Sequence, residues 1–357
     1  MPASFDVGGR IIGPGHDPFL ILEAGINHNG DMNLVRQMIS AAVDAGADAL
    51  KFQTFKAAEF VSDPQQMYTY RSQGQEVTES MLAMFKRYEL SADQWKQIVS
   101  WCHDAGIMFF STPQNISDLD FLLSLVKLPA IKVGSDDLTN IALMRYFASK
   151  GIPMMISAGM AYLSEIEAAT RAIREEGNQN LAILHCVSSY PAQSDELHLN
   201  KMATIARAFD VPVGFSDHTE GAVAASAAVA LGACIVEKHF TLDKNLSGPD
   251  HWFSADPKEA KAWVQAIRNT YRSLGIGEIR PTGRELEMRK IARRSIVAAR
   301  DLSAGTVLSL DDLTFKRPGT GLTPSHLEHL LGQRISRPIA RDALVTFADL
   351  RAGEPHE

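Results

Sequence analysis

Short apolar runs alternate with amphipathic segments along the chain as far as Gly275. Each apolar run ends in polar residues, and the segment that follows often has apolar positions at helical spacing, as in residues 33–46, 91–106 and 163–177. Strands that alternate with helices form right-handed βαβ units and a parallel sheet. The pattern therefore predicts an α/β fold with strands over residues 19–27, 49–54, 107–113, 130–135, 153–159, 181–190, 211–219 and 234–241.

The number of these units favours a closed sheet. Eight βα units in about 260 residues are typical of a (β/α)8 TIM barrel, and no GxGxxG motif follows the first strand, as a dinucleotide-binding fold would require. We therefore predict a TIM barrel over residues 1–280. Two of its helices are expected to begin at the N-caps Ser91, which Gln94 follows, and Ser164.

One connection of the predicted barrel is unusually long. Residues 56–90 separate the second strand from its helix and exceed an ordinary βα loop. The segment carries Tyr68, Tyr70, Arg71 and Gln73, which suit a lid over a substrate. The alternative is a peripheral insertion that packs on the barrel rim.

The pattern of hydrophobic and polar residues changes after the predicted barrel. Residues 281–292 form a charged, polar linker, and residues 293–357 contain short β-like runs broken by Ser-Ala-Gly and Pro-Gly turns. This predicts a small, mostly β domain. A domain of this size has a small hydrophobic core and is often stabilised by contact with a partner.

Composition narrows the functional classes. The 357 residues are 45% hydrophobic and 22% charged, as in ordinary globular proteins, and the formal net charge of −7 argues against nucleic-acid binding. No apolar run is long enough for a membrane span, and residues 1–13 lack the pattern of a secretory signal. Three cysteines without paired spacing, Cys102, Cys186 and Cys234, suggest buried thiols in a reducing compartment. We expect a cytoplasmic protein.

Functional side chains of a TIM barrel gather where strands meet their following loops. His218 and His239 end neighbouring predicted strands, one βα repeat apart. Adjacent strands lie roughly 4.8 Å apart, so two inward-facing imidazoles there can share one metal ion. Each histidine could alternatively be structural, but their matched positions favour a metal site.

Two lysines, Lys51 and Lys132, point toward the same barrel mouth. A lysine in an apolar strand needs an anionic partner. That partner could be a buried carboxylate such as Glu23 or Glu237, or a bound phosphate and carboxylate. Small hydroxyl residues at other strand ends favour the anion site, because they supply neutral donors: Thr112, Ser135, Ser157 and Ser216.

Carboxyl groups complete the predicted site. Glu23, at the end of the first strand, could orient a sugar hydroxyl, transfer a proton or balance the lysines. Asp250 and His251 lie in a turn-rich loop after the last strand and could bind sugar hydroxyls or hold the loop in place.

Several of these segments resemble the sialic acid synthase family, the phosphoenolpyruvate-dependent nonulosonic acid synthases. The matching segments are EAGINHNG, KFQTF, FFSTP, IKVGS, ISAG, HCVSSYP, GFSDHT, EKHFTLDK and GPDH. The C-terminal part resembles the antifreeze-like (SAF) domain of those enzymes through RRSIVAARDLSAGTVL and KRPGTGL. The resemblance covers nearly the whole chain, in order. It implies a TIM barrel followed by a SAF domain, in a domain-swapped homodimer where Arg317 reaches the partner's active site.

The resemblance also implies roles for individual residues. His218 and His239 match ligands of a divalent metal, Mn²⁺ or Mg²⁺, and Glu23 and Asp137 are the candidates for proton transfer. The predicted phosphoenolpyruvate contacts are Lys51, Thr112, Lys132, Ser135, Ser157, Ser188 and Ser216. The predicted sugar contacts are Glu23, Gln53, Tyr190, Asp250 and Arg317. Two positions depart from the neuraminic acid pattern: Asp137 replaces a common glutamate, and Ser188 replaces an asparagine near the phosphate.

The expected function is condensation of phosphoenolpyruvate with an N-acetylated amino sugar and water. N-acetylmannosamine is the default acceptor, and diacetamido sugars leading to legionaminic or pseudaminic acid are alternatives. Two other classes remain open from the residues: a metal-dependent sugar isomerase or aldolase on the same barrel, and a carbohydrate- or ice-binding protein that acts through its C-terminal domain.

Overall fold

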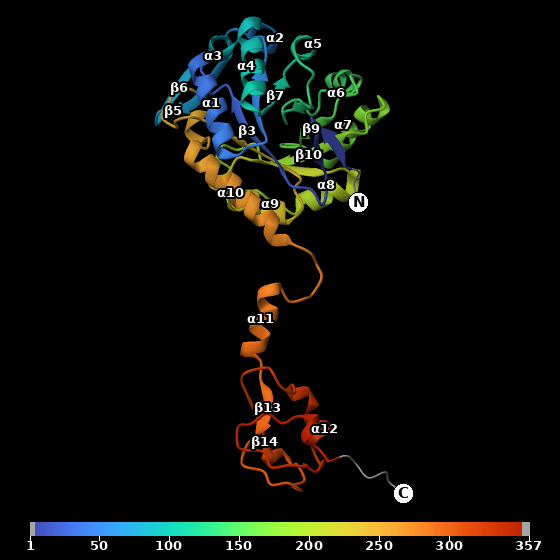
Figure 1. Cartoon of the computed structure of the whole chain (residues 1–357). Helices are drawn as coiled ribbons and strands as arrows, with labels where there is room; N and C mark the ends of the chain where they lie inside the picture. The colour runs from blue at the N-terminus through green and yellow to red at the C-terminus, as the bar shows by residue number, and fades with distance from the viewer. Residues whose placement is uncertain (1–3, 352–357) are drawn as a thin grey trace. The chain divides into compact units, whose positions relative to one another are not determined.

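The computed structural model describes residues 4–351, so the outermost residues of the two predicted domains, 1–3 and 352–357, lie outside the described part. The chain divides into two compact units, Met1–Gly275 and Ile276–Glu357. Figure 1 shows both units and labels many of their elements.

Eight parallel strands form the sheet of the first unit, in the order β7-β4-β3-β12-β11-β10-β9-β8. Contacts between β7 and β8 close this sheet, which confirms the predicted TIM barrel. Most strands end before the predicted residue because the chain leaves the sheet to enter the loops of the site. The strands are β3 (Phe19–Gly25), β4 (Ala49–Thr54), β7 (Met108–Pro113), β8 (Ile131–Val133), β9 (Met154–Ser157), β10 (Leu181–Cys186), β11 (Val213–Asp217) and β12 (Ile235–His239).

Helices surround this sheet (Figure 1). Ser91 caps α4 as predicted, since its Oγ accepts from Gln94 N at 3.3 Å. The cap predicted at Ser164 is wrong: α7 begins at Leu163, and Glu165 bonds back to the Tyr162 amide at 2.7 Å. The helices are α1 (Met32–Ala45), α4 (Ala92–Ala105), α5 (Ile116–Leu125), α6 (Ile141–Ala148), α7 (Leu163–Glu175), α8 (Lys201–Phe209), α9 (Val223–Ala230) and α10 (Pro257–Leu274).

A hairpin that the sequence pattern did not predict packs at the N-terminal end of the barrel strands. Its strands β1 (Phe5–Val7) and β2 (Arg10–Ile12) join through Gly8 and Gly9, whose φ angles of +59° and +90° suit glycine in a tight hairpin turn. The hairpin's apolar side chains join a buried cluster that includes Phe19 and Phe110. The opposite end, where the strands terminate, remains available for a site.

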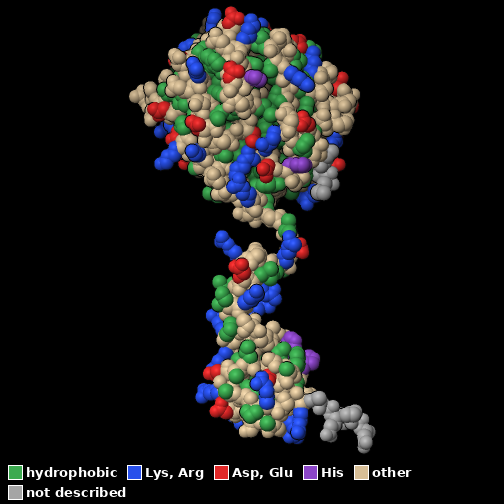
Figure 2. Space-filling view, in the orientation of Figure 1, with side chains coloured by type: hydrophobic (Ala, Val, Ile, Leu, Met, Phe, Trp, Pro, Cys, Tyr) green, Lys and Arg blue, Asp and Glu red, His purple; other side chains and the backbone are tan. Residues whose placement is uncertain are grey.

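The second unit has its own core and begins with an exposed helix. The predicted linker is helical here, as α11 (Gly283–Ala292), and none of its residues is buried. Basic side chains gather on it (Figure 2). The antiparallel strands β13 (Ser295–Ala298) and β14 (Leu313–Lys316) and the short helix α12 (Leu327–Leu330) enclose a cluster of buried aliphatic residues. Among residues 4–351, no helix combines the length and the apolar character that a bilayer span needs.

Two buried histidines hold the loops that leave β3 and β12. His28 Nδ1 accepts from Gly30 N at 3.0 Å, and His251 lies between Thr241 Oγ1 at 2.7 Å and Asn29 Oδ1 at 3.1 Å. Burial lowers the pKa of each imidazole to about 4. Both rings are therefore neutral in the folded protein at neutral pH.

This burial predicts acid sensitivity. The folded-state pKa of His28 lies below its ordinary value of 6.5, so the unfolded chain binds the proton first as the pH falls through that window. At pH 5 the shift corresponds to about 2 kcal/mol lost by this residue. We expect the Tm to fall between pH 7 and pH 5, and less so in His28→Gln. The exposed His103→Gln is the control, and an equal fall in all three proteins would contradict the assignment.

Candidate active site

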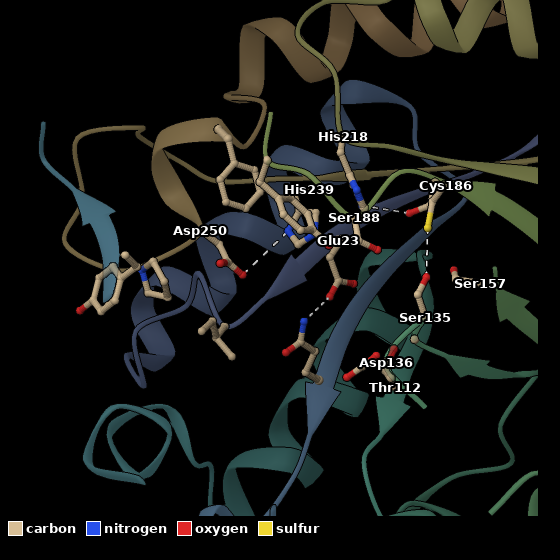
Figure 3. Close-up of a pocket in the computed structure, with 18 of the residues that line it drawn as sticks. Glu23, Thr112, Ser135, Asp136, Ser157, Cys186, Ser188, His218, His239 and Asp250 are labelled. Atoms are coloured by element: carbon tan, nitrogen blue, oxygen red, sulfur yellow. Dashed lines mark hydrogen bonds and ion pairs between the residues drawn. The ribbon is translucent and has the colours of Figure 1, made fainter. Parts of the chain in front are cut away.

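The carboxyl-terminal ends of the barrel strands surround a cavity of about 780 Å³ (Figure 3). Its volume lies in the range of small-molecule sites. Nearly all of the residues predicted from the strand ends and the resemblance meet on its wall. These are Glu23, Lys51, Gln53, Thr112, Lys132, Ser135, Ser157, Ser188, Tyr190, Ser216, His218, His239 and Asp250.

Two predicted residues are not on this wall, one against the prediction and one in agreement with it. Asp136, and not its neighbour Asp137, is among the residues of the cavity wall. The chain turns sharply after Gly134, so the alternation of a strand no longer decides which of two adjacent aspartates faces the cavity. Arg317 follows β14 and belongs to the second unit.

Lys51 is the centre of a buried charge cluster. Its Nζ lies 2.5 Å from Glu23 Oε2 and 3.6 Å from Glu237 Oε1, and it donates to Thr112 Oγ1 at 3.0 Å. Burial alone would lower the pKa of Lys51, but the two carboxylates raise it above its ordinary value. The ion pair that the sequence left as an alternative is therefore present at Lys51.

The two carboxyl groups beside Lys51 differ in proton affinity. Burial raises the pKa of Glu23 to about 7, against the attraction of Lys51. Burial also acts to raise the pKa of Glu237, but Lys132 and Lys51 together hold it below its ordinary value. Glu23 is thus the carboxyl group poised to exchange a proton near neutral pH.

Lys132 has a different environment. Its Nζ donates to Ser157 Oγ at 2.6 Å and to the Val133 carbonyl at 2.9 Å. Within residues 4–351 no carboxylate lies in ion-pair distance of this ammonium group. Burial lowers its pKa, while Glu237 acts in the opposite direction. A buried cation held by neutral groups is suited to receive an incoming anion.

Small polar groups converge beside Gly159. Ser135 Oγ accepts from Gly159 N at 2.9 Å and lies 3.0 Å from Cys186 Sγ. A Cβ at Gly159 would collide with these atoms and with Ser188 Oγ, so only glycine fits here. Cys186 is a buried thiol as predicted, and it also lines the cavity, which the sequence pattern did not indicate.

The two histidines lie side by side with ring centroids 5.6 Å apart. His218 Nδ1 donates to the Val187 carbonyl at 2.7 Å, which leaves Nε2 as the acceptor, 3.3 Å from Ser216 Oγ. His239 Nδ1 is buried without a hydrogen-bond partner and lies 4.0 Å from Asp250 Oδ2. Burial lowers the pKa of both imidazoles, and for His239 the nearby His218 adds to this effect.

The chemistry of this pair fits a divalent metal. Neutral imidazoles are metal ligands, and a carbonyl on the second ring nitrogen fixes the ligating tautomer, as at His218. The buried, unsatisfied Nδ1 of His239 is a second donor atom. Within residues 4–351 no three His, Cys, Asp or Glu side chains group as a complete metal site. Water and substrate oxygens would therefore fill the other coordination positions.

Aromatic rings cover the histidines from outside. Tyr190 packs on His218 with ring centroids 4.2 Å apart and on Phe253 at 4.9 Å. Phe253 also contacts His239 at 5.2 Å. These rings limit the access of water to the imidazoles and form an apolar surface next to them.

The insertion 56–90 contains α2 (Ala57–Phe60), a hairpin of β5 (Met67–Ser72) and β6 (Gln75–Ser80), and α3 (Met81–Tyr88). Its hairpin packs on the loop after β12, because Ser72 Oγ accepts from Gly248 N at 3.0 Å and Arg71 stacks over Trp252 at 5.1 Å. The same segment contributes a large part of the cavity wall, through Phe60, Tyr68, Thr69, Tyr70, Arg71, Met81, Met84 and Phe85. It thus packs on the rim and encloses the cavity.

Comparisons with known proteins find relatives along nearly the whole chain. The NeuB family profile matches residues 38–279, and the SAF domain profile matches residues 293–351. An N,N'-diacetyllegionaminic acid synthase of Legionella pneumophila is 39% identical, over 94% of this chain and 95% of its own. The mouse N-acetylneuraminate-9-phosphate synthase is 34% identical, over 97% and 96%.

A solved structure shows the same architecture. The N-acetylneuraminic acid (sialic acid) synthetase of Leptospira borgpetersenii aligns with a TM-score of 0.72 and 32% identity, over 81% of this chain and 95% of its own. Because the two synthases described above match at least 94% of this chain, both the barrel and the small second unit have counterparts in synthases, and the chain is an enzyme of this type. The chain belongs to the NeuB family.

Proposed function

We propose that this enzyme condenses phosphoenolpyruvate with an N-acetylated aminohexose and water to give a nonulosonic acid and phosphate. The observation that carries the proposal is one cavity in which two buried lysines and several hydroxyl groups face two neutral imidazoles. The first set suits the anionic substrate, and the second suits the metal that activates an aldehyde. The synthase activities of the relatives support the same reading.

Phosphoenolpyruvate would lie on the lysine side of the cavity. Lys132 offers an ammonium group without a carboxylate partner, and Lys51 offers one that it shares with Glu23 and Glu237. The serine hydroxyls beside Gly159 add neutral donors for phosphate oxygens. Held in this way, carbon three of the substrate can be directed toward the aldehyde.

The reaction balances with the groups present. Carbon three bonds to the aldehyde carbon, water adds at carbon two, and the carbon–oxygen bond to phosphate breaks as the ketone forms. Of the two water protons, one ends on the former aldehyde oxygen and the other on phosphate. Glu23, with its pKa raised to about 7, is the side chain we assign to proton transfer. A divalent ion on His218 and His239, Mn²⁺ or Mg²⁺, would polarise the aldehyde as a Lewis acid.

The sugar half of the cavity favours one acceptor over another. N-acetylmannosamine, the default from sequence, has hydroxyl groups along the chain remote from its aldehyde. A diacetamido deoxy sugar carries additional methyl groups there, and the insertion provides an apolar wall at Phe60, Met84 and Phe85. The higher identity to the Legionella synthase favours the same acceptor class. We therefore propose a diacetamido trideoxyhexose as the preferred acceptor, with N-acetylmannosamine as the second candidate.

A phosphate-release assay tests both statements. We expect phosphate release to require phosphoenolpyruvate, a divalent metal and an amino sugar together, and we expect the diacetamido trideoxyhexose to give the higher kcat/KM. Met84→Gln should lower the preference for this sugar by about 10-fold, since one methylene-scale contact contributes roughly that much. Release of phosphate without sugar, or sugar isomerisation without phosphoenolpyruvate, would contradict the proposal.

We also propose that the active enzyme is a domain-swapped homodimer in which Arg317 reaches the partner's cavity. Co-expression of His218→Ala and Arg317→Ala chains tests this arrangement. Each variant alone should be inactive, while a mixed dimer regains one intact site, so the mixture should recover about a quarter of the wild-type activity. No recovery in isolated mixed dimers would contradict the swap.

A further inference from the structure

Both histidines of the candidate metal site are held from behind by one buried ion pair. The strands β11 and β12 pair in parallel, with Asp217 beside Lys238 and Ser216 beside Glu237. Because side chains alternate across a strand, Asp217 and Lys238 point away from the cavity that Ser216, Glu237 and the two histidines line. The pair lies between the sheet and helix α10.

The contacts of this pair immobilise the residues next to His218. Asp217 Oδ1 accepts from Thr219 N at 3.0 Å and from Thr219 Oγ1 at 2.7 Å. Asp217 Oδ2 accepts from Lys238 Nζ at 3.0 Å and from Trp263 Nε1 at 3.0 Å. His218 therefore stands between two residues of one closed network.

Lys238 extends the network to the neighbouring strand. Its Nζ also donates to the carbonyl of Thr219, which directly follows His218. Lys238 directly precedes His239, so this bond ties the chain beside one histidine to the chain beside the other. His239 is fixed on its other side, where its carbonyl accepts from Ala255 N at 2.8 Å. The pair thus sets the height of one imidazole relative to the other.

Burying two charged side chains is energetically costly, so the presence of this ion pair in the protein interior calls for a reason. Asp217 is 1% exposed and Lys238 is 5% exposed. Apolar residues of similar volume generally stabilise a core as well as a buried ion pair does. The directional bonds of this pair, however, fix the strand ends in a way that apolar packing would not.

We propose that Asp217, Lys238 and Thr219 are positioning residues that hold His218 and His239 at the spacing needed to share one divalent ion. This inference rests on the proposed metal site but assigns residues outside the cavity. A small misorientation of the two imidazoles lowers the metal affinity even when the fold is unchanged. Residues that orient metal ligands typically contribute 10–100-fold in metal affinity.

The test compares two charge-neutral double variants of the full chain. Asp217→Asn/Lys238→Met removes the pair without leaving a lone buried charge. The control, Asp48→Asn/Arg268→Met, removes an ion pair of 2.6 Å at the opposite end of the same barrel, where Asp48 also accepts from Leu20 N and pairs with the more exposed Arg10 at 2.9 Å. Mn²⁺ alone is the probe, with its Kd measured by electron paramagnetic resonance and the Tm measured without metal.

We expect the first double variant to remain folded in the absence of metal, with a Tm lowered by the loss of the partners of Trp263 and Thr219, and to bind Mn²⁺ at least 10-fold more weakly. The control should keep the wild-type Kd even if its Tm falls. A folded first variant with wild-type Mn²⁺ affinity would overturn the proposal, as would an equal loss in the control or a wild-type protein that binds no Mn²⁺.

A milder pair of variants covers the case in which the double variant does not fold. Thr219→Val removes one hydroxyl donor to Asp217, and Thr219→Ser keeps it. Weaker Mn²⁺ binding in the valine variant, with recovery in the serine variant, supports positioning, and equal affinities overturn it. Wild-type protein that binds Mn²⁺ but releases no phosphate would contradict the proposed reaction and leave this result intact.

Discussion

Replacing His218 by alanine is expected to abolish metal-dependent phosphate release while the barrel remains folded. The imidazole supplies one of only two protein nitrogens at the candidate metal site, with Nδ1 bound to the Val187 carbonyl and Nε2 facing the cavity. A Lewis acid contributes several kcal/mol to such a reaction, so we expect kcat/KM to fall by at least about 10³-fold. A stopped-time phosphate assay over a range of Mn²⁺ concentrations measures this.

The matched control for this variant is His103→Ala, which removes an exposed histidine from α4. It should retain wild-type turnover and Mn²⁺ dependence. Substantial metal-dependent turnover in His218→Ala, in protein whose circular dichroism matches wild type, would refute the assignment of this residue.

The second large effect is expected at Lys132, where activity should fall without a matching loss of stability. Lys132→Met removes a buried ammonium group that bonds only to Ser157 Oγ and a backbone carbonyl. The KM for phosphoenolpyruvate should rise by about 100-fold or more, as for the loss of a charge-assisted contact worth about 3 kcal/mol. The Tm of the ligand-free protein should stay close to the wild-type value, because the removal of a desolvated charge offsets the loss of its attraction for Glu237.

Lys51→Met is the informative comparison, since this ammonium group neutralises Glu23 and Glu237 at 2.5 Å and 3.6 Å. Its loss leaves the buried Glu23 carboxyl group without its ion-pair partner and Glu237 with the attraction of Lys132 alone, so the Tm should fall together with the activity. If Lys132→Met lost stability as Lys51→Met does, Lys132 would be a structural cation and the anion-site assignment would be wrong.

The barrel and the strand-end residues of its candidate site could be predicted because both depend on local periodicity, whereas Gln53, Ser188 and Tyr190 are indicated only by the resemblance. Alternation along a strand fixes which residues face inward, and the βα repeat places His218 and His239 at matching heights. This reasoning holds only inside a strand. After Gly134 the chain turns, and the sequence could not show that Asp136 faces the cavity while Asp137 does not.

Other features carry no periodic signal. The strands of the β5–β6 hairpin are largely exposed, with polar residues on both faces and the two tyrosines on one, so no buried stripe marks them. The β1–β2 hairpin has strands of three residues, too short for a pattern. The sequence predicts that Cys186 is a buried thiol, and it is buried. Only the fold shows that it also borders the cavity.

The seating of the β5–β6 hairpin has a consequence for engineering and for divergence within the family. The hairpin contacts the loop after β12 across the cavity mouth through three residue pairs: Ser72 with Gly248, Gln73 with Asn245, and Arg71 with Trp252. The hairpin and this loop therefore form one continuous wall. A change in one segment alters the contacts that hold the other in place and thereby the position of Asp250. Transplanting residues 67–80 from a synthase with another acceptor would therefore succeed only together with residues 241–254, as a two-part cassette.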